Sequence, residues 1–422
     1  MAATSEQVDA LLLFFCGALT LLIVPGLAFF VGGLAGRARA RRALLFVLSG
    51  AAVVVILCVL GGYGMLAGEP LVPHLVGVPD PGLAAQHGVY ALARAGALIA
   101  TCTVAVAIVG AAVASRITLR AWLIFCVLWS VLVLFPAGYA VFALGDGWAV
   151  SLLGVVDYGG ALPIGLAAGA SAAGVIAACG RGEHSAETGR SLPVVAIGGT
   201  LVWVGWLGLV TGSEGAVDQY IAPIAINAFV ASAAGCLMWM LVDRILLRRP
   251  TLVSVFCGAF SGLVAITPAS GVLTIGWALL LGALAALACA TMVDVAARAR
   301  FGPALALCVI VIVGSGVGLL FVGLFGAGGG MVESGNFDLF IAQGVATVAV
   351  LVYSFVISLL LALLLRFTIG LTGVRYRAER GFPSTIPDRA RPAVPPERAD
   401  KPSGPERSER SERSEHSERP GR

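Results

Sequence analysis

The chain has 422 residues, of which 59% are apolar and 12% are charged, and its formal net charge is +4. Soluble globular domains carry about a quarter charged residues, so this composition excludes an ordinary soluble protein and favours a membrane protein. The small positive charge comes mostly from arginines in short loops and near the end of the chain, and it predicts no nucleic-acid partner.

Long apolar runs follow one another up to Val374. Each is about as long as the roughly 20 residues that a helix needs to cross a bilayer core of about 30 Å. Strands of a membrane barrel would instead alternate over about 10 residues. The pattern therefore predicts an all-α polytopic membrane protein with eleven transmembrane helices. The predicted helices cover residues 8–34, 43–67, 89–114, 121–144, 161–180, 191–212, 219–242, 251–268, 272–296, 303–327 and 338–369.

Arginines gather in every second loop, and the alternate loops carry acidic residues. Loops rich in Lys and Arg stay on the cytoplasmic side of a membrane. We therefore expect the N-terminus outside the cell, the C-terminus in the cytoplasm, and a location in the plasma membrane. The arginines are Arg37, Arg39, Arg41, Arg42, Arg116, Arg120, Arg181, Arg190, Arg244, Arg248, Arg249, Arg298 and Arg300, and the acidic residues are Glu69, Asp80, Asp146, Asp157, Glu214, Asp218, Glu333 and Asp338.

Residues 1–374 are thus predicted to form the transmembrane domain, and residues 375–422 differ from them in kind. This last stretch mixes Pro and Ser with alternating Glu and Arg, and it has almost no apolar residues to bury. Such composition predicts a disordered, charged cytoplasmic tail. A docking segment for a cytosolic partner is the alternative interpretation of the same residues.

The predicted spans contain no constellation typical of an enzyme. The four histidines, His74, His87, His184 and His416, all lie in loops or in the predicted tail. We find no paired carboxylates and no nucleophile beside a base in the spans, so we expect no enzyme, no cofactor and no metal site. The nine cysteines lack C-x-x-C spacing and are interpreted as small buried apolar residues.

Six runs, in chain order, carry extended motifs. They are LTLLIVPGLAFFVGGLAGR (19–37), GYGMLAG (62–68), VDYGGALPIGLAAG (156–169), WVGWLGLVTGS (203–213), INAFVASAAG (226–235) and SGLVAITPASG (261–271). These runs resemble the Amt/Mep/Rh family of ammonium transporters, whose first span reads roughly L-L-M-T-P-G-L-A-L-F-Y-G-G and whose fifth reads L-D-F-A-G-G-T-V-V-H-I-N-A-G. The chain is identified on these motifs as a divergent member of that family.

The resemblance implies an Amt-like fold with two inverted five-helix repeats and an eleventh helix outside them. Inverted repeats place the substrate path at the interface between the repeats. The resemblance also implies a homotrimer with one pore in each subunit, and ammonium or ammonia as the substrate. The run GLTGVRYRAERG (370–381) resembles the family's C-terminal segment only loosely, so a cytosolic regulator at the C-terminus is a weaker implication.

Several polar and aromatic residues match positions that have roles in the family. Phe142 and Ser213 match the outer vestibule, where an aromatic face and a hydroxyl attract the cation. Trp206 matches a tryptophan that lines the pore. Asp157 and Asn227 match structural polar residues, and we expect Asp157 to cap the backbone amides at the start of the fifth predicted helix.

Other family positions carry different residues here. Gly165 and Val311 stand where the family has its two pore histidines, and Ala100 and Leu209 stand where it has its two gate phenylalanines. We therefore expect a pore that is wider at the gate and wholly apolar at its middle. A pore without side-chain acceptors cannot relay a proton.

Three functional hypotheses follow. The first is an ammonium or ammonia transporter or channel with weakened or altered conduction. The second is a non-transporting sensor or scaffold that acts through partners or through the C-terminal tail, and the third is a pore for another, larger solute. Arg94, early in the third predicted helix, either snorkels to the outer surface or faces the vestibule or a subunit contact, where its charge would repel a cation.

Overall fold

The computed structural model describes residues 5–180, 190–246, 249–298 and 303–372. These residues belong to one compact unit, Met1–Val374. The predicted tail, residues 375–422, lies outside the described residues and stays a prediction.

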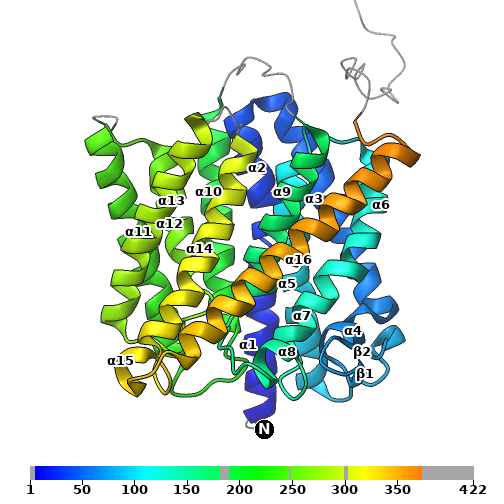
Figure 1. Cartoon of the computed structure of the whole chain (residues 1–422), viewed down its shortest axis with the longest axis vertical. Coiled ribbons are helices and arrows are strands. Elements are labelled where there is room, and N and C mark those ends of the chain that lie inside the picture. Colours follow the sequence, from blue (N-terminus) through cyan, green and yellow to red (C-terminus); the bar gives the residue numbers. More distant parts are fainter. Residues whose placement is uncertain (1–4, 181–189, 247–248, 299–302, 373–422) are drawn as a thin grey trace, which may run out of the picture. The chain divides into compact units, whose positions relative to one another are not determined.

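The first half of the bundle contains five membrane spans, and all of them except α5 are composite (Figure 1). The connections on the face where α1 begins contain the antiparallel strands β1 (Pro70–Val72) and β2 (Val76–Gly77), the short helix η2 (Pro81–Leu83) and α8 (Trp148–Ser151). The spans are α1 (Ser5–Thr20) with α2 (Ile23–Ala35), α3 (Arg37–Leu57) with η1 (Cys58–Gly62) and α4 (Tyr63–Ala67), α5 (Val89–Val113), α6 (Leu119–Trp129) with η3 (Ser130–Leu134) and α7 (Phe135–Phe142), and η4 (Leu162–Ala167) with α9 (Ala168–Cys179).

The irregular turns in these spans lie next to proline or glycine. Pro25 follows the break between α1 and α2, Pro136 follows the π-helical turn η3, and Pro163 lies inside the π-helical turn η4. A proline has no amide hydrogen to donate and its ring clashes with the carbonyl four residues earlier, so a helix bends or widens there. In η1, Gly61 has a φ of 140°, which glycine adopts without strain.

The second half is built from five more regular spans, followed by a short helix and one long helix. Within the described residues, ten of the eleven spans are long and apolar enough to cross a membrane, and α12 is a shorter apolar helix of 15 residues. The prediction of an all-α bundle with eleven spans is therefore confirmed. These elements are α10 (Leu192–Gly212), α11 (Ile221–Leu246), α12 (Leu252–Ile266), α13 (Ile275–Arg298), α14 (Pro303–Phe325), α15 (Met331–Ser334) and α16 (Asp338–Thr368).

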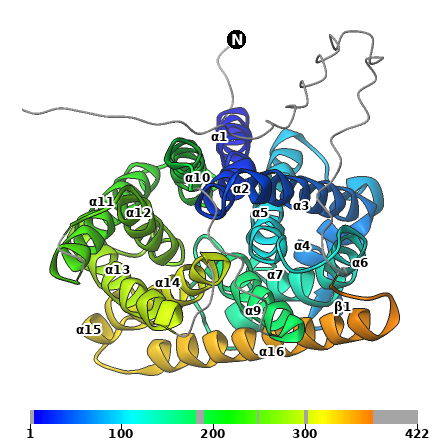
Figure 2. The same cartoon turned by 90° about the horizontal axis from the view of Figure 1, so that it is seen from above.

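The two halves meet closely where α2 packs against α10 (Figure 2). A Cβ atom at Gly26 would collide with the backbone of Val202, and one at Gly198 would collide with the backbone of Phe30. Small residues let helix backbones approach in this way within lipid, where dispersion contacts replace the hydrophobic drive. Large apolar side chains such as Leu11, Phe14 and Phe15 remain on the outer surface, as expected of helices that face lipid.

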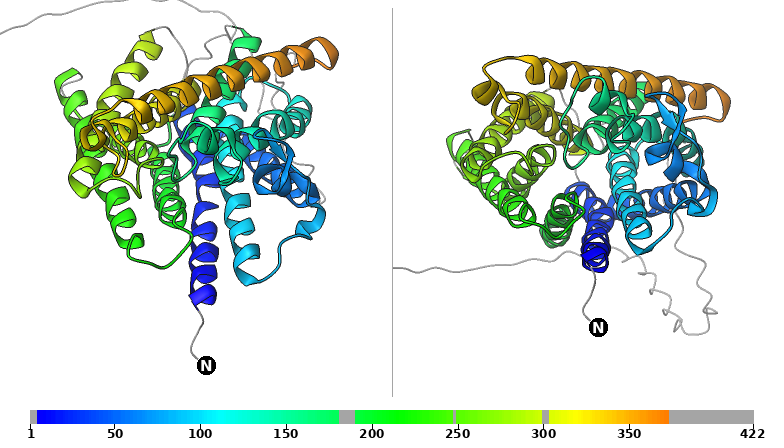
Figure 3. Two further views of the ribbon diagram at one scale, coloured as in Figure 1. Left: turned by 60° about the horizontal axis from the view of Figure 1, so that its bottom comes forward. Right: turned by 90° about the horizontal axis from the view of Figure 1, so that it is seen from below.

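Helix α16 lies along one side of the bundle and contacts both halves (Figure 3). It packs against α14 of the second half and against α6, η4 and α9 of the first. Near its start, the Gln343 side-chain amide donates to the Val156 carbonyl at 2.8 Å, and near its end the Arg366 guanidinium donates to the Ala178 carbonyl at 2.8 Å. The two acceptors flank the fifth span, so α16 is fastened to both ends of η4–α9.

Candidate functional site

A pocket of about 320 Å³ lies among α1, α5, the end of α7 and the end of α10, on the face where α1 begins. We call it the vestibule pocket. Phe142, Ser213, Leu209 and Asp157 all line it, so the fold brings together four of the residues singled out in the sequence. The Ser213 hydroxyl donates to the Val210 carbonyl at 2.7 Å, which leaves its oxygen lone pairs as acceptors.

Charged and phenolic side chains also line the vestibule pocket. Arg94 of α5 lies in its wall together with Tyr90, one turn earlier on the same helix. This placement agrees with the vestibule interpretation of Arg94. Glu214, in the loop after α10, and Tyr158, in the loop before η4, line the pocket as well, and the Tyr158 hydroxyl donates to the Glu214 carboxylate.

Sequence reasoning did not identify Glu214 and Tyr158 as site residues. Burial, followed by the hydrogen bond and the negative charge of Asp218, raises the pKa of Glu214 to about 7. Glu214 directly follows Ser213, which the family motif identifies, and that adjacency was the one signal in the sequence that pointed to it. The pocket therefore contains a carboxyl group that changes charge near neutral pH.

Asp157 forms the helix cap that its position predicts. Its two carboxylate oxygens accept hydrogen bonds from the backbone amides of Ala161 at 2.7 Å and Leu162 at 2.8 Å, and the residue is 8% exposed. Burial raises the pKa of Asp157 to about 6, and the hydrogen bonds from the backbone oppose that rise. The carboxyl group is thus mostly ionised at neutral pH, and it holds the start of the fifth span beside the pocket.

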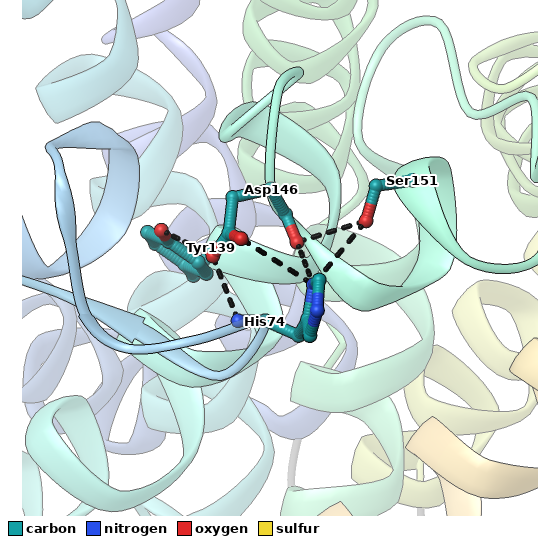
Figure 4. A network of polar contacts seen from close by, with 4 residues as sticks. All are labelled: His74, Tyr139, Asp146 and Ser151. Carbon is teal, nitrogen blue, oxygen red and sulfur yellow. Dashed lines mark hydrogen bonds and ion pairs between the residues drawn. The ribbon is translucent and has the colours of Figure 1, made fainter.

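A network of polar contacts holds the turn that follows Phe142 (Figure 4). The Asp146 carboxylate accepts hydrogen bonds from the Tyr139 hydroxyl at 2.9 Å and from the His74 backbone amide at 2.7 Å. The His74 ring lies 3.4 Å from the same carboxylate, and the Ser151 hydroxyl donates to the Asp146 carbonyl at 2.9 Å. Because Tyr139 belongs to α7, the network anchors the helix end that carries Phe142.

The region around Gly165 and Val311 is closely packed. Gly165 in η4 faces α14, and a Cβ atom there would collide with the Ser315 hydroxyl. One turn further along, a Cβ at Gly169 would lie 2.7 Å from a side-chain methyl of Val311. Ser315 is fully buried, so a hydroxyl lies beside Gly165, where the sequence led us to expect apolar surroundings. The pore through this region stays a prediction.

The remaining predicted positions lie outside the vestibule pocket. Ala100 is buried in α5, and its neighbours Ala97 and Thr101 line the pocket in its place. The Trp206 indole donates to the Thr267 hydroxyl at 3.0 Å. The Asn227 amide donates to the carbonyls of Ser270 at 3.0 Å and Leu273 at 2.8 Å, which fits a structural role in holding the turn after α12.

Comparison with known proteins gives consistent results. Residues 11–383 match the model of the Ammonium Transporter Family. An ammonium transporter of Mycobacterium tuberculosis is 32% identical over 399 residues, which cover 84% of this chain and 83% of that protein.

Two solved structures resemble the fold. Mep2 of Saccharomyces cerevisiae has a TM-score of 0.79 and 22% sequence identity, and the match covers 87% of each chain. A structure described as a sensor Amt protein also has a TM-score of 0.79, with 19% identity over 88% of this chain and 96% of that one. At these identities the two likenesses concern the fold alone.

Proposed function

Because the chain belongs to the ammonium transporter family, we propose that it is an ammonium or ammonia transporter or channel whose conduction is weakened by the loss of both pore histidines. The members of this family are transporters, not enzymes. The observation that carries the proposal is that Phe142 and Ser213, distant in sequence, line one pocket.

The vestibule pocket supplies what an ammonium ion needs on arrival. The Phe142 ring offers its negative face, an interaction of roughly 0.5–2 kcal/mol, and the Ser213 oxygen offers lone pairs. Beyond the pocket, Gly165 and Val311 provide no group that accepts a proton. In this proposal ammonium therefore gives its proton to water at the pocket, and neutral ammonia crosses the closely packed middle slowly.

The proposal extends to location and assembly. The pocket opens on the face that carries Glu69, Asp80, Asp146 and Glu214, and the positive-inside rule makes this the extracellular face of a plasma membrane. We also propose a homotrimer, as in the family that the sequence resembles. The regulator expected at residues 370–381 falls largely outside the described residues.

One observation favours a second candidate, a sensor or scaffold that does not transport. Gly165 and Ser315 leave no space for a side chain at the position of the first pore histidine, so the closed middle is part of the packing between η4 and α14. A pocket above a closed path is suited to detect a solute without passing it.

Flux into proteoliposomes separates the two candidates. After an ammonium gradient is applied, the internal pH and the membrane current are recorded, with protein-free liposomes as the control. A rise in internal pH without current supports slow passage of ammonia, as proposed. A sustained current shows that a path without histidines still carries charge, which contradicts the proposal of weakened conduction. No change in either quantity favours the sensor.

A further inference from the structure

The vestibule pocket is larger than an ammonium ion requires. Its volume is about 320 Å³, whereas a molecule the size of water takes about 30 Å³ in the liquid. Pockets that bind small organic molecules begin at about 300 Å³. The pocket is therefore large enough for a ligand of several non-hydrogen atoms.

Within the described residues, the Arg94 side chain in one wall of the pocket forms no ion pair with Glu214 or Asp157, the two carboxylates that line the same pocket. Arg94 lies within a membrane span and lines the pocket. Within the residues that the structure describes, its guanidinium takes part in no ion pair or hydrogen bond, and the Tyr63 phenol lies within range of its charge. Arg94 is half-buried in the second turn of α5, so a partner of opposite charge would strengthen a site here. A ligand carboxylate would supply one, in the paired geometry that guanidinium groups favour.

The loop after α10 supplies a negative charge to the same pocket. Tyr90 lies one turn before Arg94, and its hydroxyl is 3.2 Å from where a Cβ at Gly215 would lie. The α5 wall therefore approaches the loop that holds Glu214. Glu214 is partly desolvated, and its side chain meets Tyr158 and Asp218, neither of which brings a positive charge. An amino group of the ligand would supply that charge.

We propose that the vestibule pocket binds a small zwitterion with an ammonium group and a carboxylate group, the α-amino acids being the simplest class. Arg94 pairs with the carboxylate, and Glu214, Phe142 and Ser213 surround the ammonium group. The binding of the ligand's ammonium group rests on the proposed function. The carboxylate group and the larger size of the ligand go beyond it.

Calorimetric titration of the purified full chain tests this proposal. The probes are glycine, alanine, methylammonium and acetate, at pH 8, where Glu214 is ionised. We expect glycine or alanine to bind at least about tenfold more tightly than either single-charge probe, because each adds one charge-assisted contact. Arg94→Gln should abolish the advantage over methylammonium, and Glu214→Gln the advantage over acetate. Arg120→Gln, an exposed arginine at the start of α6, is the matched control and should change neither.

The other outcomes overturn the proposal. Methylammonium that binds as tightly as glycine, with Arg94→Gln without effect, makes the pocket a plain cation vestibule. Acetate that binds as tightly as glycine makes it an anion site, and absence of binding by all four probes removes the site. Because titration needs no flux, the result is independent of transport: a chain that binds glycine but passes no ammonia keeps the inference and loses the proposed function, and the reverse result does the opposite.

Discussion

The Ser315 hydroxyl fills the space that a side chain at Gly165 would need, and this contact joins the fifth span to α14. Gly165→Ala should therefore destabilise the protein by about 1–3 kcal/mol, the usual cost of overpacking a filled interior. Thermal unfolding of the solubilised protein measures the effect. Adding Ser315→Ala removes the colliding hydroxyl, so the double variant should recover most of the loss.

Gly316→Ala is the control for this experiment, because a Cβ at Gly316 meets nothing within 4 Å. Gly316 belongs to α14, the helix of Ser315. Its replacement by alanine should leave the unfolding temperature unchanged or slightly raised, since alanine favours a helix. Equal losses for Gly165→Ala and Gly316→Ala would contradict the packing described here.

Asp157→Asn should also destabilise the protein. An asparagine has one side-chain oxygen, so one of the two amides that Asp157 satisfies is left buried without an acceptor. An unsatisfied buried donor costs about 1–3 kcal/mol. The variant should unfold at a lower temperature, whereas Asp338→Asn, at the first residue of α16, should not. Unchanged stability of Asp157→Asn would mean that the cap contributes little.

Phe142→Trp should strengthen binding of methylammonium to the vestibule pocket, and Phe142→Ala should weaken it. A tryptophan ring attracts a cation more than a phenylalanine ring does, and differences of about 0.5–1 kcal/mol correspond to roughly two- to fivefold in affinity. Titration calorimetry gives the three dissociation constants. The order Trp, Phe, Ala from tightest to weakest is expected; identical constants would place the cation away from this ring.

Glu214 should make the affinity for methylammonium depend on pH. Its pKa is raised to about 7, so its charge, which attracts a cation, is present above that pH and lost below it. The groups around it are Tyr158 before η4, Asp218 in its own loop, Tyr90 and Arg94 of α5, Cys16 of α1, and Asp157. Binding should weaken more steeply between pH 8 and pH 6 in the native chain than in Glu214→Gln. An equal slope in both proteins would assign the dependence to Asp157.

The raised pKa of Glu214 also makes the stability of the fold depend on pH, in the opposite direction from cation binding. A raised pKa means that the folded state holds the Glu214 proton more tightly than the unfolded state does. Its contribution is fully present below pH 4.5, the ordinary pKa of a glutamate, and is lost as pH rises through about 7. We therefore compare the unfolding temperature of Glu214→Gln with that of the native chain at each pH. The difference, variant minus native, should be larger at pH 8 than at pH 5. No difference between the two values of pH would contradict the shift.

Asp146→Asn should loosen the strand pair β1–β2 without affecting distant helices. The hydrogen bond from the His74 amide lowers the pKa of Asp146. The carboxylate therefore stabilises the fold above the ordinary pKa of an aspartate, and this stabilisation is lost as the pH falls through the lowered pKa. Hydrogen exchange at pH 7 should rise in residues 70–78 of the variant and stay constant in α13. A uniform rise of hydrogen exchange across the chain would indicate general destabilisation and not the loss of a local contact.

The apolar runs predict the spans because lipid requires each helix to satisfy its own backbone and to present apolar side chains outward. For the same reason the predicted edges agree with the observed helices within a few residues, as for residues 89–114 and α5. Asp157 was predictable as well, because an acidic residue just before a helix has few other backbone partners.

Contacts between distant segments were not predictable in this way. The pairing of Tyr158 with Glu214 joins two loops, and neither has a periodic pattern. The contact of Gly165 with Ser315 depends on the register of η4 against α14, and the π-helical turn shifts that register by an amount that apolar spacing does not encode. Thr101, and not Ala100, lines the vestibule pocket, a difference of one residue that the apolar spacing of α5 does not encode.

The two-point attachment of α16 has a mechanical consequence. Its 31 residues span roughly 46 Å at 1.5 Å per residue, and Gln343 and Arg366 tie them to the two ends of the fifth span. A movement of the fifth span along its own axis therefore either breaks these two hydrogen bonds or moves α16 as well. Helix α16 ends at Thr368. The fifth span and α16 are therefore expected to move as one unit.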